Sequence, residues 1–343
     1  MRIGSGLFAA LTGLSALSFS NAAYWIDPES CSKQAHQDLI VEGIEGALKM
    51  MDAAATQLTN PNDDFTRVLT TLFGPDTQRQ TNNLRRIYAK TIPSVRTRDM
   101  SATKPLLGYY GVRFYCDSRR LTRKYSLTKG TWLFNEHTRE RIDNEPTVGE
   151  QLGSFFECAL VFAWTTCPWS DAESCEITFC PFFLEYAMKR KHNTFISWWR
   201  PNLWARLALL VDRRITDRWF TPIDLVSLFD KVILHEIMHT RGAEGGPLPR
   251  DRYNPEDVGG VRGYGWNNVK KIANVVTDLS VRPLVLGPEK NADSLALFGS
   301  AALMIQEGIK INDNGSFVRP EGMNERRFDV WFEELLEKNE ESK

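Results

Sequence analysis

Two histidines, His235 and His239, stand four residues apart in the sequence His-Glu-Ile-Met-His. Residues at this spacing lie on one face of a helix, about one turn apart, so both imidazoles can bind the same zinc ion. Glu236 stands beside the first histidine and can act as a general base on a water molecule at that metal. By chance, the pattern is expected about once in a hundred chains of this composition. It predicts a hydrolytic zinc site; the alternative is a core helix with two ordinary histidines.

The preceding sequence predicts the helix that must carry these residues. Thr221, Pro222 and Asp224 are typical of a helix start, because they supply a capping hydroxyl, a proline in the first turn and an early acid. Apolar residues then recur at helical spacing as far as Ile237, and Gly242 is typical of a helix end. The two histidines are therefore expected on an amphipathic helix.

A catalytic zinc site has three protein ligands and one open position. No histidine follows His239, so we expect the third ligand to be an acid. The acids considered lie in the following loop or on the next predicted helix: Glu244, Glu256, Asp257 and Asp278. Spacing alone leaves these acids open as alternatives.

The segment 230–305 resembles the aspzincins, the secreted fungal zinc peptidases that include deuterolysin and peptidyl-Lys metalloendopeptidase. The resemblance rests on His-Glu-x-x-His, on the stretch from Asp257 to Trp266 with its Tyr-Gly pair, and on Asn-Ala-Asp at 291–293. It implies a zinc-dependent endopeptidase that acts on proteins or peptides. The implied roles are zinc ligation by His235, His239 and Asp257, general base catalysis by Glu236, oxyanion binding by Tyr264 and substrate binding by Asp293.

The chain departs from the family pattern in the loop after the helix. The family places its ligating Asp three residues before the Tyr, where this chain has Val261, which cannot bind a metal. Asp257 stands seven residues before Tyr264, and the Gly-Gly pair between them is expected to let the longer loop bring it to the metal. Lys-selective members have a second acid where this chain has Ala296, so no strict preference for Lys is expected.

Composition limits the classes of partner and the compartment. The 343 residues carry a formal net charge of −1, which recommends neither nucleic acid nor an anionic membrane as partner. Residues 1–22 have Arg2, a short apolar run and small residues at the end, as in a signal peptide, so we expect a secreted, extracellular protein. No later apolar run is long enough to span a membrane. Six cysteines beyond residue 22 predict three disulfides, with 15 possible pairings. Four of these cysteines lie within 158–180 and predict a disulfide-stapled cap there.

The predicted elements indicate an α+β fold that is mostly helical, and the resemblance implies a zincin-like metalloprotease with a small sheet. Helices are expected over 31–58, 65–73, 77–89, 150–166, 266–279 and 291–307, and strands over 108–115, 131–134 and 177–179. Strand 131–134 or 177–179 is expected to pair with an extended peptide. Residues 23–343 are expected to form a single, monomeric catalytic domain. Its parts are a helical region over about 31–105, a metal-site region over about 106–308 and a C-terminal amphipathic helix over about 321–338.

Two other functions fit parts of the sequence. A secreted zinc-binding protein without peptidase activity, such as a metal scavenger or surface antigen, would explain the histidines but not the need for Glu236. Residues 194–220 interleave Trp with Arg, a composition that can bind glycans or nucleic acid but is more often ordinary packing.

Overall fold

The computed structural model describes residues 23–101, 111–126, 130–136, 140–142, 162–167, 174–189, 221–225, 228–240, 257–258, 261–275 and 287–318. The predicted signal peptide over 1–22, the Trp-rich segment 194–220 and the C-terminal helix over 321–338 lie outside these residues. The described helices are α1 (Gln34–Thr59), α2 (Asp63–Phe73), α3 (Thr77–Ser94), α6 (Pro181–Lys189), α9 (Pro222–Leu225), α10 (Leu228–Met238), α12 (Trp266–Val275) and α13 (Ala292–Gln306). The fold is therefore mixed, with helices predominating and a small sheet.

The main sheet has five strands in the order β2-β1-β3-β8-β7. The strands are β1 (Tyr24–Ile26), β2 (Arg98–Asp99), β3 (Val112–Tyr115), β7 (Ala163–Thr166) and β8 (Cys175–Phe179). Four of them run parallel, and β7 pairs antiparallel with β8 at the edge. The helix predicted over 150–166 is wrong over 163–166, where a short apolar run forms β7; such runs cannot be assigned by periodicity alone.

Three smaller sheets complete the described strands. Strands β4 (Leu121–Ser126), β5 (Gly130–Asn135) and β6 (Glu140–Ile142) form an antiparallel sheet, and β9 (Asp257–Val258) pairs with β10 (Val261–Arg262). The last pair is β11 (Lys310–Ile311) and β12 (Phe317–Val318). Neither strand expected to pair with a peptide has a free side, because β5 lies between β4 and β6 and β8 lies between β3 and β7. That expectation is wrong, and among the described strands the edges of the main sheet are β2 and β7.

Short polar side chains begin several helices, as sequence patterns of this kind predict. Asn62 accepts a hydrogen bond from the Phe65 N–H at 2.8 Å and so caps α2. Asn291 accepts from the Ser294 N–H at 2.7 Å and caps α13, which confirms the helix predicted from residue 291. These bonds satisfy N–H groups that have no partner within the helix.

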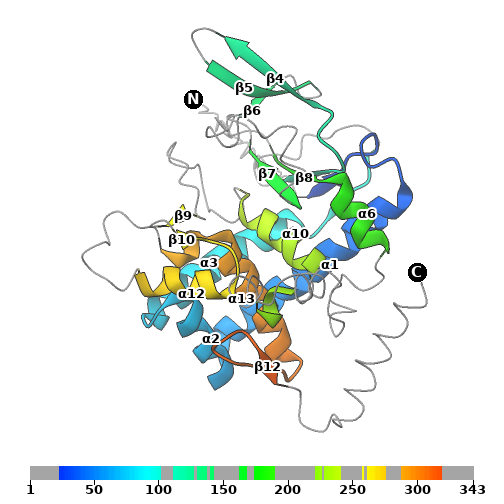
Figure 1. The fold of residues 1–343 in the computed structure, drawn as a ribbon. Coiled ribbons are helices and arrows are strands. Elements are labelled where there is room, and N and C mark those ends of the chain that lie inside the picture. Colours follow the sequence, from blue (N-terminus) through cyan, green and yellow to red (C-terminus); the bar gives the residue numbers. More distant parts are fainter. Residues whose placement is uncertain are drawn as a thin grey trace, which may run out of the picture.

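Helix α10, which carries the candidate site, packs against α1, α13 and β7. Figure 1 shows it between the edge of the main sheet and the group of α1 and α13. The side chains of Ile233, Leu234 and Ile237 are completely buried. Helix α1 can approach α10 closely because Gly43 has no side chain. A Cβ atom there would lie only 2.5 Å from Ile233 Cδ1. The helix is therefore enclosed, and its polar groups need partners inside the protein.

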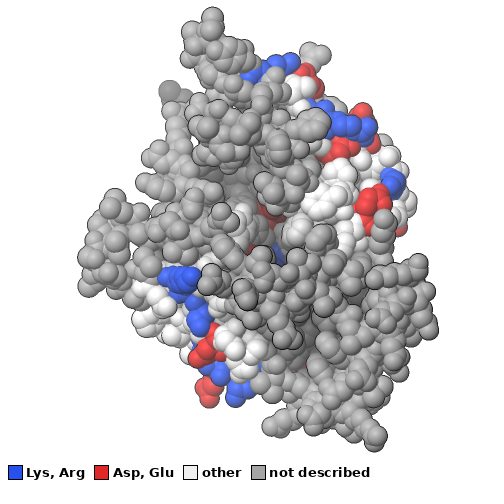
Figure 2. Space-filling view, in the orientation of Figure 1, with Lys and Arg blue, Asp and Glu red and all other residues white. Residues whose placement is uncertain are grey.

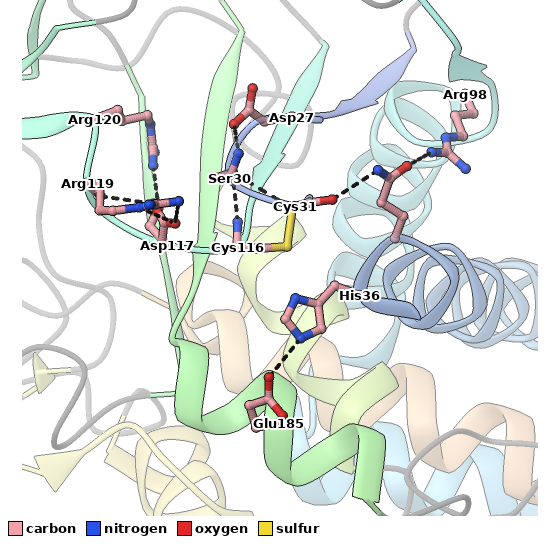
Figure 3. Close-up of a disulfide and its surroundings, with 11 residues drawn as sticks. Asp27, Ser30, Cys31, His36, Arg98, Cys116, Asp117, Arg119, Arg120 and Glu185 are labelled. Carbon is pink, nitrogen blue, oxygen red and sulfur yellow. Dashed lines mark hydrogen bonds and ion pairs between the residues drawn. A yellow bond between two sulfur atoms is a disulfide. The ribbon is translucent and has the colours of Figure 1, made fainter. Parts of the chain in front are cut away.

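Two complete disulfides involve strands of the main sheet or the residues next to them. Cys31, just before α1, is bonded to Cys116 at the end of β3, and the Cys116 N–H donates to Ser30 Oγ at 3.2 Å (Figure 3). Cys167 is bonded to Cys175 and closes the connection between β7 and β8. Cys180 is also disulfide-bonded, and none of the described cysteines is free. The expectation that cysteines staple this fold is confirmed for the two complete pairs.

The described surface mixes both signs of charge. On the face drawn in Figure 2, described Lys and Arg side chains lie next to Asp and Glu rather than in a broad patch of one sign. Among the described residues, we find no helix with the length and apolar character that crossing a bilayer requires.

A buried ionic network connects the main sheet to the β4–β5–β6 sheet. Glu176 on β8 accepts hydrogen bonds from Arg120 Nη2 at 3.0 Å and from Asn135 Nδ2 at 2.8 Å. The Tyr115 hydroxyl lies 3.3 Å from the other carboxylate oxygen, and Arg113 Nη1 lies 3.9 Å from it. Glu176 is only 1% exposed, so its charge is compensated almost wholly by these groups.

We predict that Glu176→Gln lowers the free energy of unfolding by about 3 kcal/mol, because two buried arginines lose their carboxylate. The control is Asp52→Asn, which breaks the exposed pair between Asp52 and Arg96 and should cost less than about 1 kcal/mol. Urea denaturation of the full chain measures both. Equal losses for the two variants would contradict a stabilising network at Glu176.

Candidate metal centre

The two histidines of the predicted motif converge in the structure. His235 lies in the last turn of α10, and His239 follows the helix end, where its N–H donates to the Glu236 carbonyl oxygen at 3.1 Å. Their ring centroids are 4.8 Å apart with an interplanar angle of 74°. The two Nε2 atoms are 3.1 Å apart. The two imidazoles therefore converge as predicted, but His239 lies just beyond the end of α10 and not on the helix.

This spacing fits a shared metal ion. Two nitrogen ligands at about 2.0–2.1 Å from a tetrahedral zinc ion lie about 3.3 Å from each other. The observed Nε2 separation of 3.1 Å needs little adjustment to reach that value. Among the side chains that the structure describes, no third His, Cys, Asp or Glu joins the two histidines in a metal-binding group. The residues present therefore fit two of the three expected zinc ligands.

Asp293, at the start of α13, holds the other side of His235. Its Oδ1 lies 3.2 Å from His235 Nδ1, and its Oδ2 accepts the Gly265 N–H at 2.6 Å. Burial opposes ionisation most strongly, but the hydrogen bond from His235, the nearby Lys231 and the Gly265 N–H keep the pKa of Asp293 below its ordinary value. An ionised carboxylate only accepts hydrogen bonds, so this contact favours a proton on Nδ1 of His235 and leaves Nε2 as the nitrogen that can bind a metal.

Glu236 is held from the opposite side by the edge strand. The Thr165 hydroxyl on β7 lies 2.7 Å from Glu236 Oε2 and 2.8 Å from the Glu236 backbone oxygen. Both residues belong to elements that contact each other, and Glu236 is buried. The carboxylate of the residue that follows His235 is thus fixed through one oxygen.

Tyr264 lies over His235 because of the turn at Gly265. The two rings stack with centroids 5.6 Å apart and an interplanar angle of 19°, and Tyr264 is 46% exposed. Gly265 has a φ of +82°, a left-handed conformation that side chains rarely adopt. This conformation lets the chain present the Gly265 N–H to Asp293 immediately after Tyr264. The tyrosine is therefore both fixed at the site and accessible from outside.

Asp257 reaches the same region through a hairpin. It lies in β9 and is paired with Arg262 of β10, two residues before Tyr264. The pairing places Asp257 next to Arg262, while Gly259 and Gly260, which are expected to let the loop reach the metal, lie outside the described residues. The side chain of Asp257 lies outside the described atoms, as do the alternative ligands Glu244, Glu256 and Asp278, so the third ligand stays a prediction.

A second buried acid, Asp224, binds the backbone immediately after Gly265. Asp224 accepts the Trp266 N–H at 2.9 Å through Oδ1 and the Thr221 hydroxyl at 3.0 Å through Oδ2. Burial raises the pKa of Asp224, against the lowering influence of Lys231 and of the hydrogen bonds from Thr221 and Trp266. The Lys231 ammonium donates to the Asp224 carbonyl oxygen at 2.6 Å. The consecutive N–H groups of residues 265 and 266 thus go to two different buried acids.

The sequence did not predict two contacts next to the site, those of Thr165 with Glu236 and of Asp224 with Trp266. Thr165 lay in a segment expected to be helical, and only the strand and its place at the sheet edge bring it to Glu236. Asp224 is predicted at a helix start and lies in α9, but its bond to Trp266 spans 42 residues. No local pattern signals either contact.

The predicted site residues that the structure describes come together around α10. His239, Tyr264 and Asp293 all contact His235, and Glu236 lies between the histidines in sequence. The substrate-binding role implied for Asp293 stays a prediction, because both described contacts of its carboxylate are internal. Comparisons with protein-family models, with curated proteins and with solved structures found no match to this chain.

We predict that the full chain binds one zinc ion and that His239→Ala weakens this binding by a factor of 100 or more, of the order expected when a metal ligand is lost. His36→Ala is the control, because the imidazole of His36 faces Glu185 on α6, with Nε2 3.4 Å from its Oε1 (Figure 3). Competition with a chromophoric chelator measures the affinity, and metal analysis measures the stoichiometry. Equal affinity in the two variants would exclude His239 as a ligand.

Proposed function

We propose that this protein is a secreted zinc-dependent endopeptidase with a zincin-like catalytic domain, related to the aspzincins. The observation that carries the proposal is the convergence of two imidazole nitrogens, 3.1 Å apart, beside a fixed glutamate. His235 and His239 are two zinc ligands in this proposal, and Asp257 is the third. The hairpin that pairs Asp257 with Arg262 supports its choice over the other acids, because it returns that residue towards the Tyr264 turn.

Zinc bound at this site would polarise the scissile carbonyl and lower the pKa of a bound water molecule towards about 7. Glu236 is the general base that takes the proton from the attacking water and passes it to the leaving amine. Because Thr165 holds Oε2 of this carboxylate, Oε1 is the oxygen left to exchange the proton. The chain therefore supplies an oriented base rather than a freely rotating one.

Tyr264 is the donor to the oxyanion of the tetrahedral intermediate in this proposal. Its ring is stacked on His235 and its side chain is partly exposed, so the hydroxyl can reach a substrate held next to the histidines. The Gly265 turn fixes the tyrosine before substrate arrives. Such preorganisation lowers the cost of stabilising charge at the moment of reaction.

The edge strand β7 supports an extended peptide as substrate. It pairs only with β8 in the described main sheet, so its other side can accept backbone hydrogen bonds from a bound chain. Thr165 ties this strand to Glu236, which supports a peptide bound along β7 next to the proposed base. A protein or peptide is therefore the substrate class that the arrangement fits best.

Export is proposed from two observations. The chain begins with a sequence typical of a signal peptide, and the structure holds disulfides, which form and persist in oxidising compartments. Both agree with an enzyme that acts outside the cell.

The central test is Glu236→Gln, which keeps the shape of the side chain but removes the base. We predict that this variant keeps zinc binding and loses peptidase activity on casein by at least about 100-fold, in line with the contribution of a general base. The control Glu185→Gln, at a surface pair with Lys33, should retain activity. Full activity of Glu236→Gln would remove it as the base. Zinc binding without hydrolysis by the unaltered chain would favour the non-catalytic zinc protein.

We predict that Thr165→Val lowers kcat about tenfold, because Glu236 loses one hydrogen bond to a charged group, worth about 1.5 kcal/mol. Thr166→Val on the same strand is the matched control, since its buried Oγ1 has no hydrogen-bond partner among the described residues. Kinetics on a peptide substrate and thermal unfolding of both variants give the comparison. A change in kcat common to both variants would show that strand packing, not the hydroxyl, is responsible.

A further inference from the structure

We propose that Asp293 is a positioning residue that fixes the metal-binding form of His235 and holds the Tyr264 turn in place with the same carboxylate. The proposal rests on the zinc site proposed above and assigns Asp293 a role other than the substrate contact implied by resemblance. It follows from the two oxygens of this side chain, which serve two different elements.

The first oxygen acts on α10. Oδ1 lies 3.2 Å from His235 Nδ1, and the two side chains are both buried, so water does not compete for this bond. The bond favours the tautomer in which Nδ1 carries the proton, and Nε2, 3.1 Å from Nε2 of His239, is then the metal-binding nitrogen. A carboxylate behind a ligating histidine also orients its ring and raises its basicity.

The second oxygen acts on the turn. Oδ2 accepts the Gly265 N–H at 2.6 Å, and Asn291, two residues earlier, donates from Nδ2 to the Gly263 carbonyl oxygen at 3.2 Å. The start of α13 therefore holds residues on both sides of Tyr264. Since Tyr264 also stacks on His235, one carboxylate sets the relative position of the ligand and the tyrosine.

An amide of the same shape cannot accept hydrogen bonds from both His235 Nδ1 and the Gly265 N–H. In Asp293→Asn, one terminal atom is an acceptor and the other is a donor. If the oxygen accepts the Gly265 N–H, the NH₂ group faces Nδ1 and favours the tautomer with a proton on Nε2, which blocks metal binding. If the amide is reversed, two N–H groups meet at Gly265 and the turn loses its bond.

Asp224→Asn is a matched control. Asp224 is also buried, and it accepts the N–H of Trp266, the residue after Gly265, but the structure shows no contact between its described atoms and His235. A role that is only structural predicts similar effects for both substitutions. A positioning role predicts that only Asp293→Asn affects the histidine.

The test measures zinc affinity of the full chain and its two variants by chelator competition, together with the His235 tautomer in the zinc-free protein by ¹⁵N NMR. We expect Asp293→Asn to weaken zinc binding about 10- to 100-fold and to shift the proton from Nδ1 to Nε2, while Asp224→Asn does neither. Equal zinc affinity in the unaltered chain and Asp293→Asn, or equal loss in both variants, would overturn the inference. Zinc binding that depends on Asp293 in a chain without peptidase activity would sustain the inference and overturn the proposed enzyme. A chain that binds no zinc would overturn both.

Discussion

The enclosure of α10 is the constraint on which the site depends. A helix buried between α1, α13 and β7 cannot leave polar side chains without partners, because an unsatisfied buried group costs about 1–3 kcal/mol. His235 and Glu236 are therefore matched by Asp293 from α13 and Thr165 from β7. The contacts that satisfy the helix are the same ones that orient its reactive atoms. Stability and geometry are thus supplied by one set of hydrogen bonds.

Local sequence patterns predicted much of the helical structure. The periodic apolar residues of α1 and α2, and the Asn291 cap of α13, follow from interactions within a few residues, so they can be read from the chain. The face shared by His235 and His239 was predictable for the same reason. The edge strand β7 was not, because four residues are too few to distinguish a strand from a buried helix by periodicity.

Contacts between distant segments explain what the sequence could not show. The bond between His235 and Asp293 spans 58 residues, and the one between Thr165 and Glu236 spans 71. Each depends on sheet order and helix packing, which no single motif encodes. The motif therefore predicts which atoms can bind a metal, while the fold decides which neighbours hold them. Likewise, the cysteine count predicts how many disulfides can form, but only the fold shows that Cys31 pairs with Cys116 and Cys167 with Cys175.

Two buried acids near the Gly265 turn, Asp293 and Asp224, have pKa values shifted in opposite directions by their surroundings. Asp293 faces an imidazole and keeps its pKa low, whereas burial raises the pKa of Asp224, which meets neutral N–H and hydroxyl groups. A raised folded-state pKa means that the fold favours protonated Asp224, so this contribution to stability is present below the ordinary Asp pKa of about 3.9 and is lost as pH rises through the raised value. The hydrogen bonds from Thr221 and Trp266 limit that loss at neutral pH. Asp293, which contacts the proposed ligand His235, is thus favoured in its ionised form. Asp224 is the acid whose ionised form is disfavoured by burial.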